Sequence, residues 1–322
     1  MNFDLPYIPS RPEKPREKGL TMMMDKGLSV RQTEDFIESA GHLTDVIKFG
    51  FGTSLVTNRL EDKIKLYQEA GVRPYFGGTL FEAFIARGRF DDYQKFVDKM
   101  GLDLCEVSDG SIIIPQDEKC EYIRKLAKNF TVFSEVGSKE EGMIISPGKW
   151  IRMMTNELEA GSWKVIAEGR ESGSVGIFRR NGQPHTVLIN KIIAKVKPEQ
   201  ILWEAPVKTQ QVWFINLFGE NVNLGNIAPH EVIPLECLRL GLRGDTFFNY
   251  LQPFRYHTST PSPGVHVFSF ALNPEDDQPS GTCNMSRIDL VQLQLALRWI
   301  FHKKDPKLNC NNLDLNDGYE LF

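Results

Sequence analysis

Short apolar runs alternate with amphipathic segments along most of this 322-residue chain. From Gly19 onward, each run is rich in strand-forming residues and ends in glycine or a charged residue, and a segment with apolar residues at helical spacing follows it. The pattern predicts eight strands, at residues 20–24, 46–51, 73–76, 104–107, 131–133, 163–167, 201–203 and 222–224. Strands that alternate regularly with helices favour a parallel sheet.

Cap and stop residues support the helices between these strands. Ser29 and Gln32 have the spacing of a capping box, which predicts that a helix begins there. Gly71 follows a helical pattern of Leu60, Ile64 and Tyr67 and predicts the end of that helix. Each predicted strand is therefore joined to the next by helical structure.

Eight strand–helix units within residues 19–248 predict an α/β fold of the (β/α)8 TIM-barrel type, which typically needs ~250 residues. An open, doubly wound sheet is the alternative, but that fold usually carries a glycine-rich phosphate loop after its first strand. Here the first predicted strand is followed by Asp25, Lys26 and Gly27 instead. The sequence therefore favours the closed barrel.

Two segments do not fit the repeat. Residues 1–18 are rich in proline and charge, which disfavours helix and interior strand, so we expect an arm that lies over the barrel. Residues 249–322 show strand-like alternation, for example over 265–270, with turn-forming residues at 273–281. We therefore expect three segments: an arm, a barrel and a β-rich tail.

The amino-acid composition limits the kinds of binding partner and the cellular compartment that we expect for this protein. Hydrophobic residues make up 41% and charged residues 25%, and the net charge of −4 gives no general attraction to nucleic acid or to an anionic membrane. The five cysteines lack the spacing of a zinc site, which indicates free thiols in a reducing compartment. Because no apolar stretch reaches ~18 residues, we expect a soluble, cytoplasmic protein.

Charged residues concentrate where the predicted strands end, which in a barrel of this type is where the active site lies. These residues are Asp25, Lys26, Lys48, Glu106, Asp109, Glu135, Lys139, Glu168, Arg170, Glu171, Glu204 and Lys208, with Arg243 and Asp245 after the last helix. Any single one could be an ordinary surface charge. However, Glu106, Glu168 and Glu204 are set within runs that should be buried, so each needs a cation or hydrogen-bond donors.

Several carboxylates facing several Lys and Arg side chains suit Mg²⁺ together with anionic substrates. A salt-bridge network that only closes the top of the barrel is the alternative. Glycines at the strand ends would let the backbone approach an anion, although each could also serve only a tight turn. These glycines are Gly50, Gly52, Gly77, Gly78, Gly137, Gly169 and Gly173.

Nine segments, in order along residues 19–248, resemble the phosphosulfolactate synthase family. They are LTMMMDKGLS, VIKFGFGTS, YFGGTLFE, EVSDGS, SEVGSK, VIAEGRESG, WEAPVKTQQVWFI, NVNLGNIA and LECLRLGLRGDTF. The resemblance implies a Mg²⁺-dependent barrel enzyme, a lyase that adds sulfite to phosphoenolpyruvate and forms (2R)-phospho-3-sulfolactate, a step toward coenzyme M or related sulfonates. It also suggests a homo-oligomer, with a trimer as the expected state.

The family chemistry gives the candidate residues their roles. A Mg²⁺ ion on the substrate carboxylate would stabilise enolate-like charge, and a general acid must protonate the middle carbon. We assign the general acid to Lys139; family members often carry two basic residues at this turn, whereas Ser138 stands first here, so the register stays open by one residue. The metal ligands are expected among Glu106, Asp109, Glu135, Glu168 and Glu204. The substrate anions are expected on Lys26, Lys48, Arg170, Lys208 and Arg243.

Two other functions remain open. The family also resembles plant heat-stress-associated proteins, whose role is protective, but the full set of strand-end charges favours the synthase. The segments FRYHTSTPSPG and FSFALNPEDDQPSGTCNMSRID in the tail resemble the C-terminal jelly roll of major capsid proteins of large nucleocytoplasmic DNA viruses. Most strands of that fold are missing, so we expect an incomplete jelly-roll-like tail, and a capsid-related role is the third hypothesis. A strand-forming extension packed on the barrel is the simpler alternative.

Overall fold

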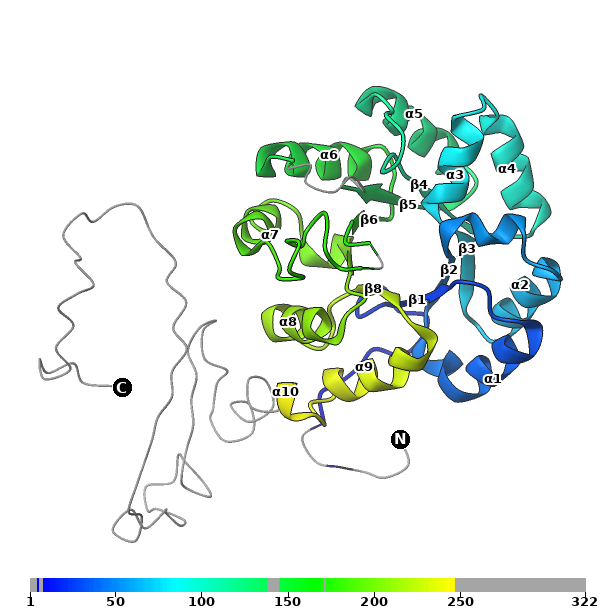
Figure 1. The fold of residues 1–322 in the computed structure, drawn as a ribbon. Helices are drawn as coiled ribbons and strands as arrows, with labels where there is room; N and C mark the ends of the chain where they lie inside the picture. The colour runs from blue at the N-terminus through cyan, green and yellow to red at the C-terminus, as the bar shows by residue number, and fades with distance from the viewer. Residues whose placement is uncertain (1–4, 6–7, 138–144, 171, 247–322) are drawn as a thin grey trace, which may run out of the picture.

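The computed structural model describes residues 5, 8–137, 145–170 and 172–246 (Figure 1). Eight parallel strands lie at the centre, and helices surround them. The strands are β1 (Thr21–Asp25), β2 (Val46–Phe49), β3 (Arg73–Phe76), β4 (Leu104–Val107), β5 (Thr131–Val136), β6 (Lys164–Ala167), β7 (Ile201–Glu204) and β8 (Leu224–Ile227). All eight predicted strands are confirmed, although β8 lies nearer the C-terminus than expected.

The helices follow the strands as the alternation predicts. They are α1 (Val30–Ala40), α2 (Leu60–Glu69), α3 (Gly78–Ile85), α4 (Phe90–Lys99), α5 (Gln116–Leu126), α6 (Pro147–Glu159), α7 (Thr186–Ile193), α8 (Lys208–Phe218), α9 (Val232–Arg239) and α10 (Gly244–Thr246). The predicted capping box is confirmed, since Ser29 and Gln32 each accept a hydrogen bond from the other's backbone amide. Gly71 has a φ of 66° just after α2, which is the left-handed conformation expected where a helix ends. No described helix is both long enough and apolar enough to cross a membrane.

The strands form a nearly closed ring in the order β3-β2-β1-β8-β7-β6-β5-β4. The two ends of this order, β3 and β4, are linked by side chains rather than by a described backbone ladder. Arg73 and Asp103 form an ion pair of 2.8 Å across this seam, and the Gly78 amide donates to the Glu106 carboxylate at 2.6 Å. The structure is thus a nearly closed TIM barrel, which agrees with the predicted (β/α)8 fold, and its one seam lies between β3 and β4.

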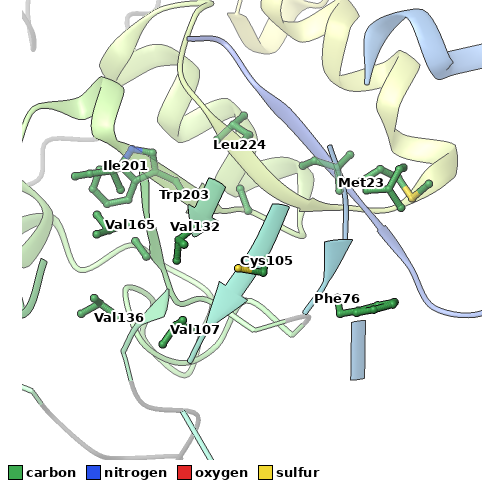
Figure 2. Packing of buried hydrophobic residues seen from close by; sticks show 14 of the residues in the cluster. Met23, Phe76, Cys105, Val107, Val132, Val136, Val165, Ile201, Trp203 and Leu224 are labelled. Carbon is green, nitrogen blue, oxygen red and sulfur yellow. The ribbon is translucent and has the colours of Figure 1, made fainter. Parts of the chain in front are cut away.

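The strands separate two hydrophobic clusters because successive side chains on a strand point to opposite faces. Figure 2 shows the cluster between strands and helices, with Met23, Val132 and Trp203 among its residues. The second cluster fills the barrel interior and consists of Leu20, Met22, Val46, Tyr75, Leu104, Phe133, Ile166 and Leu202. This interior cluster is the apolar floor beneath the candidate site.

The N-terminal arm closes the opposite end of the barrel. The Arg11 guanidinium pairs with Glu236 at 3.0 Å and donates to the Gly19 carbonyl, and Arg16 pairs with Asp45 at 3.1 Å. Lys14 donates to the Thr44 carbonyl at 2.6 Å. The described part of residues 1–18 therefore packs on the barrel through these contacts. The predicted tail, 249–322, lies outside the described residues.

Candidate active site

The charged layer of the barrel follows from the two-residue period of its strands. The interior apolar cluster includes Val46, Leu104, Phe133, Ile166 and Leu202. The residue two positions further along each of these strands points into the barrel again, one layer nearer the C-terminal ends. These residues are Lys48, Glu106, Glu135, Glu168 and Glu204, and all are buried. A layer of charge thus lies directly above a layer of hydrocarbon.

Lys48 of β2 is the centre of this layer. Its ammonium nitrogen lies 3.1 Å from a Glu106 oxygen, 3.2 Å from Glu135 and 3.3 Å from Glu204. Burial alone would lower the pKa of Lys48, but the neighbouring carboxylates outweigh it and raise that pKa well above its usual value. Lys48 is therefore charged, and it holds carboxylates from β4, β5 and β7 in one place.

Three of the carboxylates form a group that could bind a cation. Glu135, Glu168 and Glu204 each present an oxygen, and these three oxygens lie within 4.8 Å of one another. The backbone fixes their positions, because the Arg170 amide donates to Glu168 at 2.7 Å and the Gly169 amide donates to Glu204 at 2.9 Å. Ser108 donates to Glu135 at 3.0 Å. Hard oxygen ligands gathered in this way fit Mg²⁺, held directly or through water.

A cavity of about 190 Å³ opens above these groups. Its wall contains the three carboxylates and Lys48, the start of α3 at Gly77, Gly78 and Thr79, and the rim residue Arg170. Gly78 leaves no room for a side chain, since a Cβ there would lie 2.3 Å from Ser108. This close packing brings the N-terminus of α3, which favours negative charge, to the cavity.

The structure brings some of the predicted site residues together and leaves others apart. Lys48, Glu106, Glu135, Glu168 and Glu204 form the buried layer, and the exposed Arg170 lies at the rim of the cavity. Lys139, the predicted general acid, lies outside the described residues.

Four other candidates do not join this layer. Asp109 pairs instead with the buried Lys119 at 2.8 Å, next to Glu157. Lys208 and Arg243 both pair with Asp245, at 2.7 and 3.8 Å.

Lys26 lies 5.4 Å from the Phe51 ring centroid and lines neighbouring grooves rather than the carboxylate cavity.

Two residues at the site, Glu82 and Asn226, were not among the predicted site residues, although both lie within segments that carry the family resemblance. Glu82 lies on α3, within a helix rather than at a strand end, yet its buried carboxylate accepts hydrogen bonds from Ser108 Oγ at 2.5 Å and from the Ser111 amide at 2.9 Å. It thereby fixes the loop after β4. Asn226 of β8 lines the cavity. Both were missed because their importance depends on neighbours from distant segments.

Comparison with known proteins gives separate matches for the two parts of the chain. Residues 228–312 match a family model described as large eukaryotic DNA virus major capsid protein. The major capsid protein of Phaeocystis pouchetii virus is 54% identical over 59 residues, which cover 18% of this chain and 11% of that protein. The resemblance of the tail to capsid proteins is therefore confirmed in sequence, over a short part of those proteins.

More distant relatives match the barrel. The protein HEAT-STRESS-ASSOCIATED 32 of Arabidopsis thaliana is 26% identical and covers 71% of this chain and 88% of that protein. Among solved structures, 3-hexulose-6-phosphate synthase from Salmonella typhimurium superposes with a TM-score of 0.45 and 14% identity over 70% of this chain and 92% of the other. At that score the barrel assignment rests on the strand pairing described above.

Three further matches cover nearly the whole barrel. Residues 9–245 match the family model of (2R)-phospho-3-sulfolactate synthase. The phosphosulfolactate synthase of Bacillus subtilis is 39% identical over 75% of this chain and 97% of that protein. The phosphosulfolactate synthase of Methanocaldococcus jannaschii is 41% identical over 72% of this chain and 94% of that protein. With its buried charged layer and these matches, the chain belongs to the phosphosulfolactate synthase family of enzymes.

Proposed function

We propose that the barrel catalyses the Mg²⁺-dependent addition of sulfite to phosphoenolpyruvate, which gives (2R)-phospho-3-sulfolactate. The observation that carries this proposal is the convergence of Glu135, Glu168 and Glu204 on one cavity, beside Lys48, in a chain of this family. Three carboxylates so close together repel one another, and a hard divalent cation between them would relieve that repulsion.

Glu135, Glu168 and Glu204 are the residues that would hold Mg²⁺. When bound, the ion would stabilise the negative charge that develops on the substrate carboxylate. The backbone amides of Gly169 and Arg170 hold two of these carboxylates in place before any ligand arrives. The ammonium group of Lys48 limits the repulsion within the cluster and so helps to hold the carboxylates close together.

Positive groups at the cavity suit the phosphate and sulfite anions. Arg170 lies at the rim, and the start of α3 at Gly77 to Thr79 faces the cavity. Both favour anions, the first through its charge and the second through the helix dipole. We assign anion binding to these groups rather than to Lys208 or Arg243, which pair with Asp245 instead.

In the proposed step, the sulfur lone pair of sulfite forms a bond to the methylene carbon of phosphoenolpyruvate. The electrons of the carbon–carbon double bond move toward the carboxylate, and a proton added to the middle carbon completes the product. Lys139 remains the proposed proton donor, because it follows β5, whose Glu135 lies at the cavity. Its test is Lys139→Met, which should lower kcat strongly while the protein stays folded.

The direct test is product formation by the purified protein. With phosphoenolpyruvate, sulfite and Mg²⁺, phosphosulfolactate should appear in the ³¹P spectrum and should be absent when Mg²⁺ is chelated. A second test is Glu168→Gln, which replaces one carboxylate oxygen with an NH2 group and should abolish the Mg²⁺ response. Folded wild-type protein that forms no product under these conditions would exclude the proposal.

A further inference from the structure

Asn226 is a buried polar side chain at the cavity. Its residue is 6% exposed, and its amide oxygen has no hydrogen-bond partner among the described residues. No hydrogen bond joins its amide nitrogen to the described residues either. A buried polar group without a hydrogen bond lowers the stability of the folded protein, so the presence of this amide calls for an explanation other than stability.

A second asparagine, Asn223, lies just before the same strand and has a structural role. Asn223 accepts a hydrogen bond from the Leu20 amide at 3.1 Å and donates to the carbonyls of Glu199 and Ile201, both at 3.0 Å. Its side chain thus ties β8 to its neighbours at the floor of the barrel. Asn226, near the cavity end of β8, makes no equivalent contact, so packing of the strand does not explain it.

The backbone of β8 is distorted at Asn226. Thr21 of β1 pairs with Leu224, and Met23 pairs with Ile227, so two steps on β1 match three steps on β8. The extra residue is a bulge, and Asn226 takes a φ of 58° within it. Bulges of this kind redirect a side chain and are common beside active sites. Here the redirected residue lines the carboxylate cavity.

The charge of the cavity indicates what the amide would bind. Glu135, Glu168 and Glu204 repel an anionic substrate, and Lys48 already pairs with carboxylates. A neutral amide can donate a hydrogen bond to a substrate oxygen without adding negative charge to this wall. We propose that Asn226 is a substrate-binding residue whose amide donates to an anionic oxygen of the phosphorylated three-carbon acid. This inference rests on the proposed function.

A purely conformational role is the competing explanation, because asparagine is one of the few side chains that accept a left-handed backbone. Asn226→Gly separates the two, since glycine adopts this φ freely but lacks the amide. The expected result is an unchanged or higher melting temperature without ligand and a KM for phosphoenolpyruvate raised about tenfold or more. Asn226→Asp keeps the shape but replaces the donor with a charge, and should raise KM at least as much.

The control is Asn223→Ala, which should lower the melting temperature and leave the KM for phosphoenolpyruvate within twofold of wild type. The rise in melting temperature on addition of phosphoenolpyruvate or of inorganic phosphate shows which substrate oxygen accepts the hydrogen bond from the Asn226 amide. Loss of both shifts in Asn226→Gly places the amide on the phosphate, and loss of the first alone places it on the carboxylate.

A KM and thermal shifts that match wild type in Asn226→Gly would overturn the inference while the proposed function stands. A folded wild type that neither forms product nor responds to phosphoenolpyruvate would overturn both.

Discussion

Buried charged side chains in this barrel occur in mutually compensating groups. Lys48 lies among carboxylates of the cavity, Lys63 pairs with Asp25 at 2.6 Å, and Lys119 pairs with Glu157 at 2.9 Å. Such groups contribute little net stability, but the loss of one member leaves an uncompensated charge inside the protein. Substitutions therefore distinguish groups that only support the fold from those that take part in chemistry.

Lys119 belongs to the first kind. It is fully buried on α5, pairs with Asp109 and Glu157, and donates to the main-chain carbonyl of Glu135 at 2.6 Å, but its own side chain does not line the carboxylate cavity. We expect Lys119→Met to lower the free energy of unfolding by about 3–5 kcal/mol, because two carboxylates lose their counter-charge. Denaturant titration measures this. Lys95→Met, at an exposed position on α4, should stay within about 0.5 kcal/mol of wild type; equal effects of the two would contradict this assignment.

We assign Glu204 to the second kind, as a ligand of the proposed metal ion. Glu204→Gln keeps the shape of the side chain but removes a negative charge from the proposed metal site, so kcat should fall by about 10²-fold or more. The Mg²⁺-induced rise in melting temperature should disappear with it. Asp245→Asn, at the exposed pair with Lys208, should leave both quantities unchanged. Wild-type activity in Glu204→Gln would remove this carboxylate from the mechanism.

At the scale of elements, the strands could be predicted because the sequence pattern of each strand is local. A run such as Val46–Phe49, followed by glycines and a helical pattern, predicts one strand without knowledge of the others. The convergence of Glu135 and Glu204 could also be predicted, since parallel strands bring their C-terminal ends together.

Other features depend on exact register or on distant partners. The bulge at Asn226 arises from the pairing of β8 with β1, and Asp109 meets Lys119 of α5 rather than the cavity. Lys208, at the start of α8, binds Asp245 of α10 because those two helices pack together. A charge that follows a strand therefore does not by itself predict a side chain in the site.

Helix α3 supports the loop after β4 through Glu82. This buried carboxylate accepts hydrogen bonds from Ser108 Oγ and from the amides of Gly110 and Ser111. Glu82→Ala should leave those donors unsatisfied and lower the free energy of unfolding by roughly 2–4 kcal/mol. Because Ser108 also donates to Glu135, kcat should fall as well. Glu82→Gln retains one acceptor oxygen and should show a smaller loss; unchanged stability in Glu82→Ala would contradict this role.

At the scale of the molecule, the two family matches overlap over residues 228–245. In the structure these residues belong to the barrel: Arg239 of α9 is fully buried and donates to the carbonyls of Val222 at 2.7 Å and Leu20 at 3.1 Å. They thus complete the ring of helices around the strands. The boundary between the barrel and the tail is expected after α9, near residue 248.

Two truncations test this boundary between the barrel and the tail. A chain that ends at residue 248 should unfold cooperatively, with a melting temperature within a few degrees of the full chain. A chain that ends at residue 227 loses α9 and the buried contacts of Arg239, and it should not fold. Circular dichroism during heating measures both. Loss of the fold in the first truncation would show that the tail is part of the barrel's stability.

The central claim is that carboxylates from three strands hold one metal ion beside the substrate. Crystals grown with Mn²⁺ in place of Mg²⁺ and with phosphoenolpyruvate test it by anomalous diffraction. The account predicts one strong anomalous peak among Glu135, Glu168 and Glu204, with the substrate carboxylate next to it. A peak elsewhere, or a bound substrate with no metal among these three side chains, would contradict it.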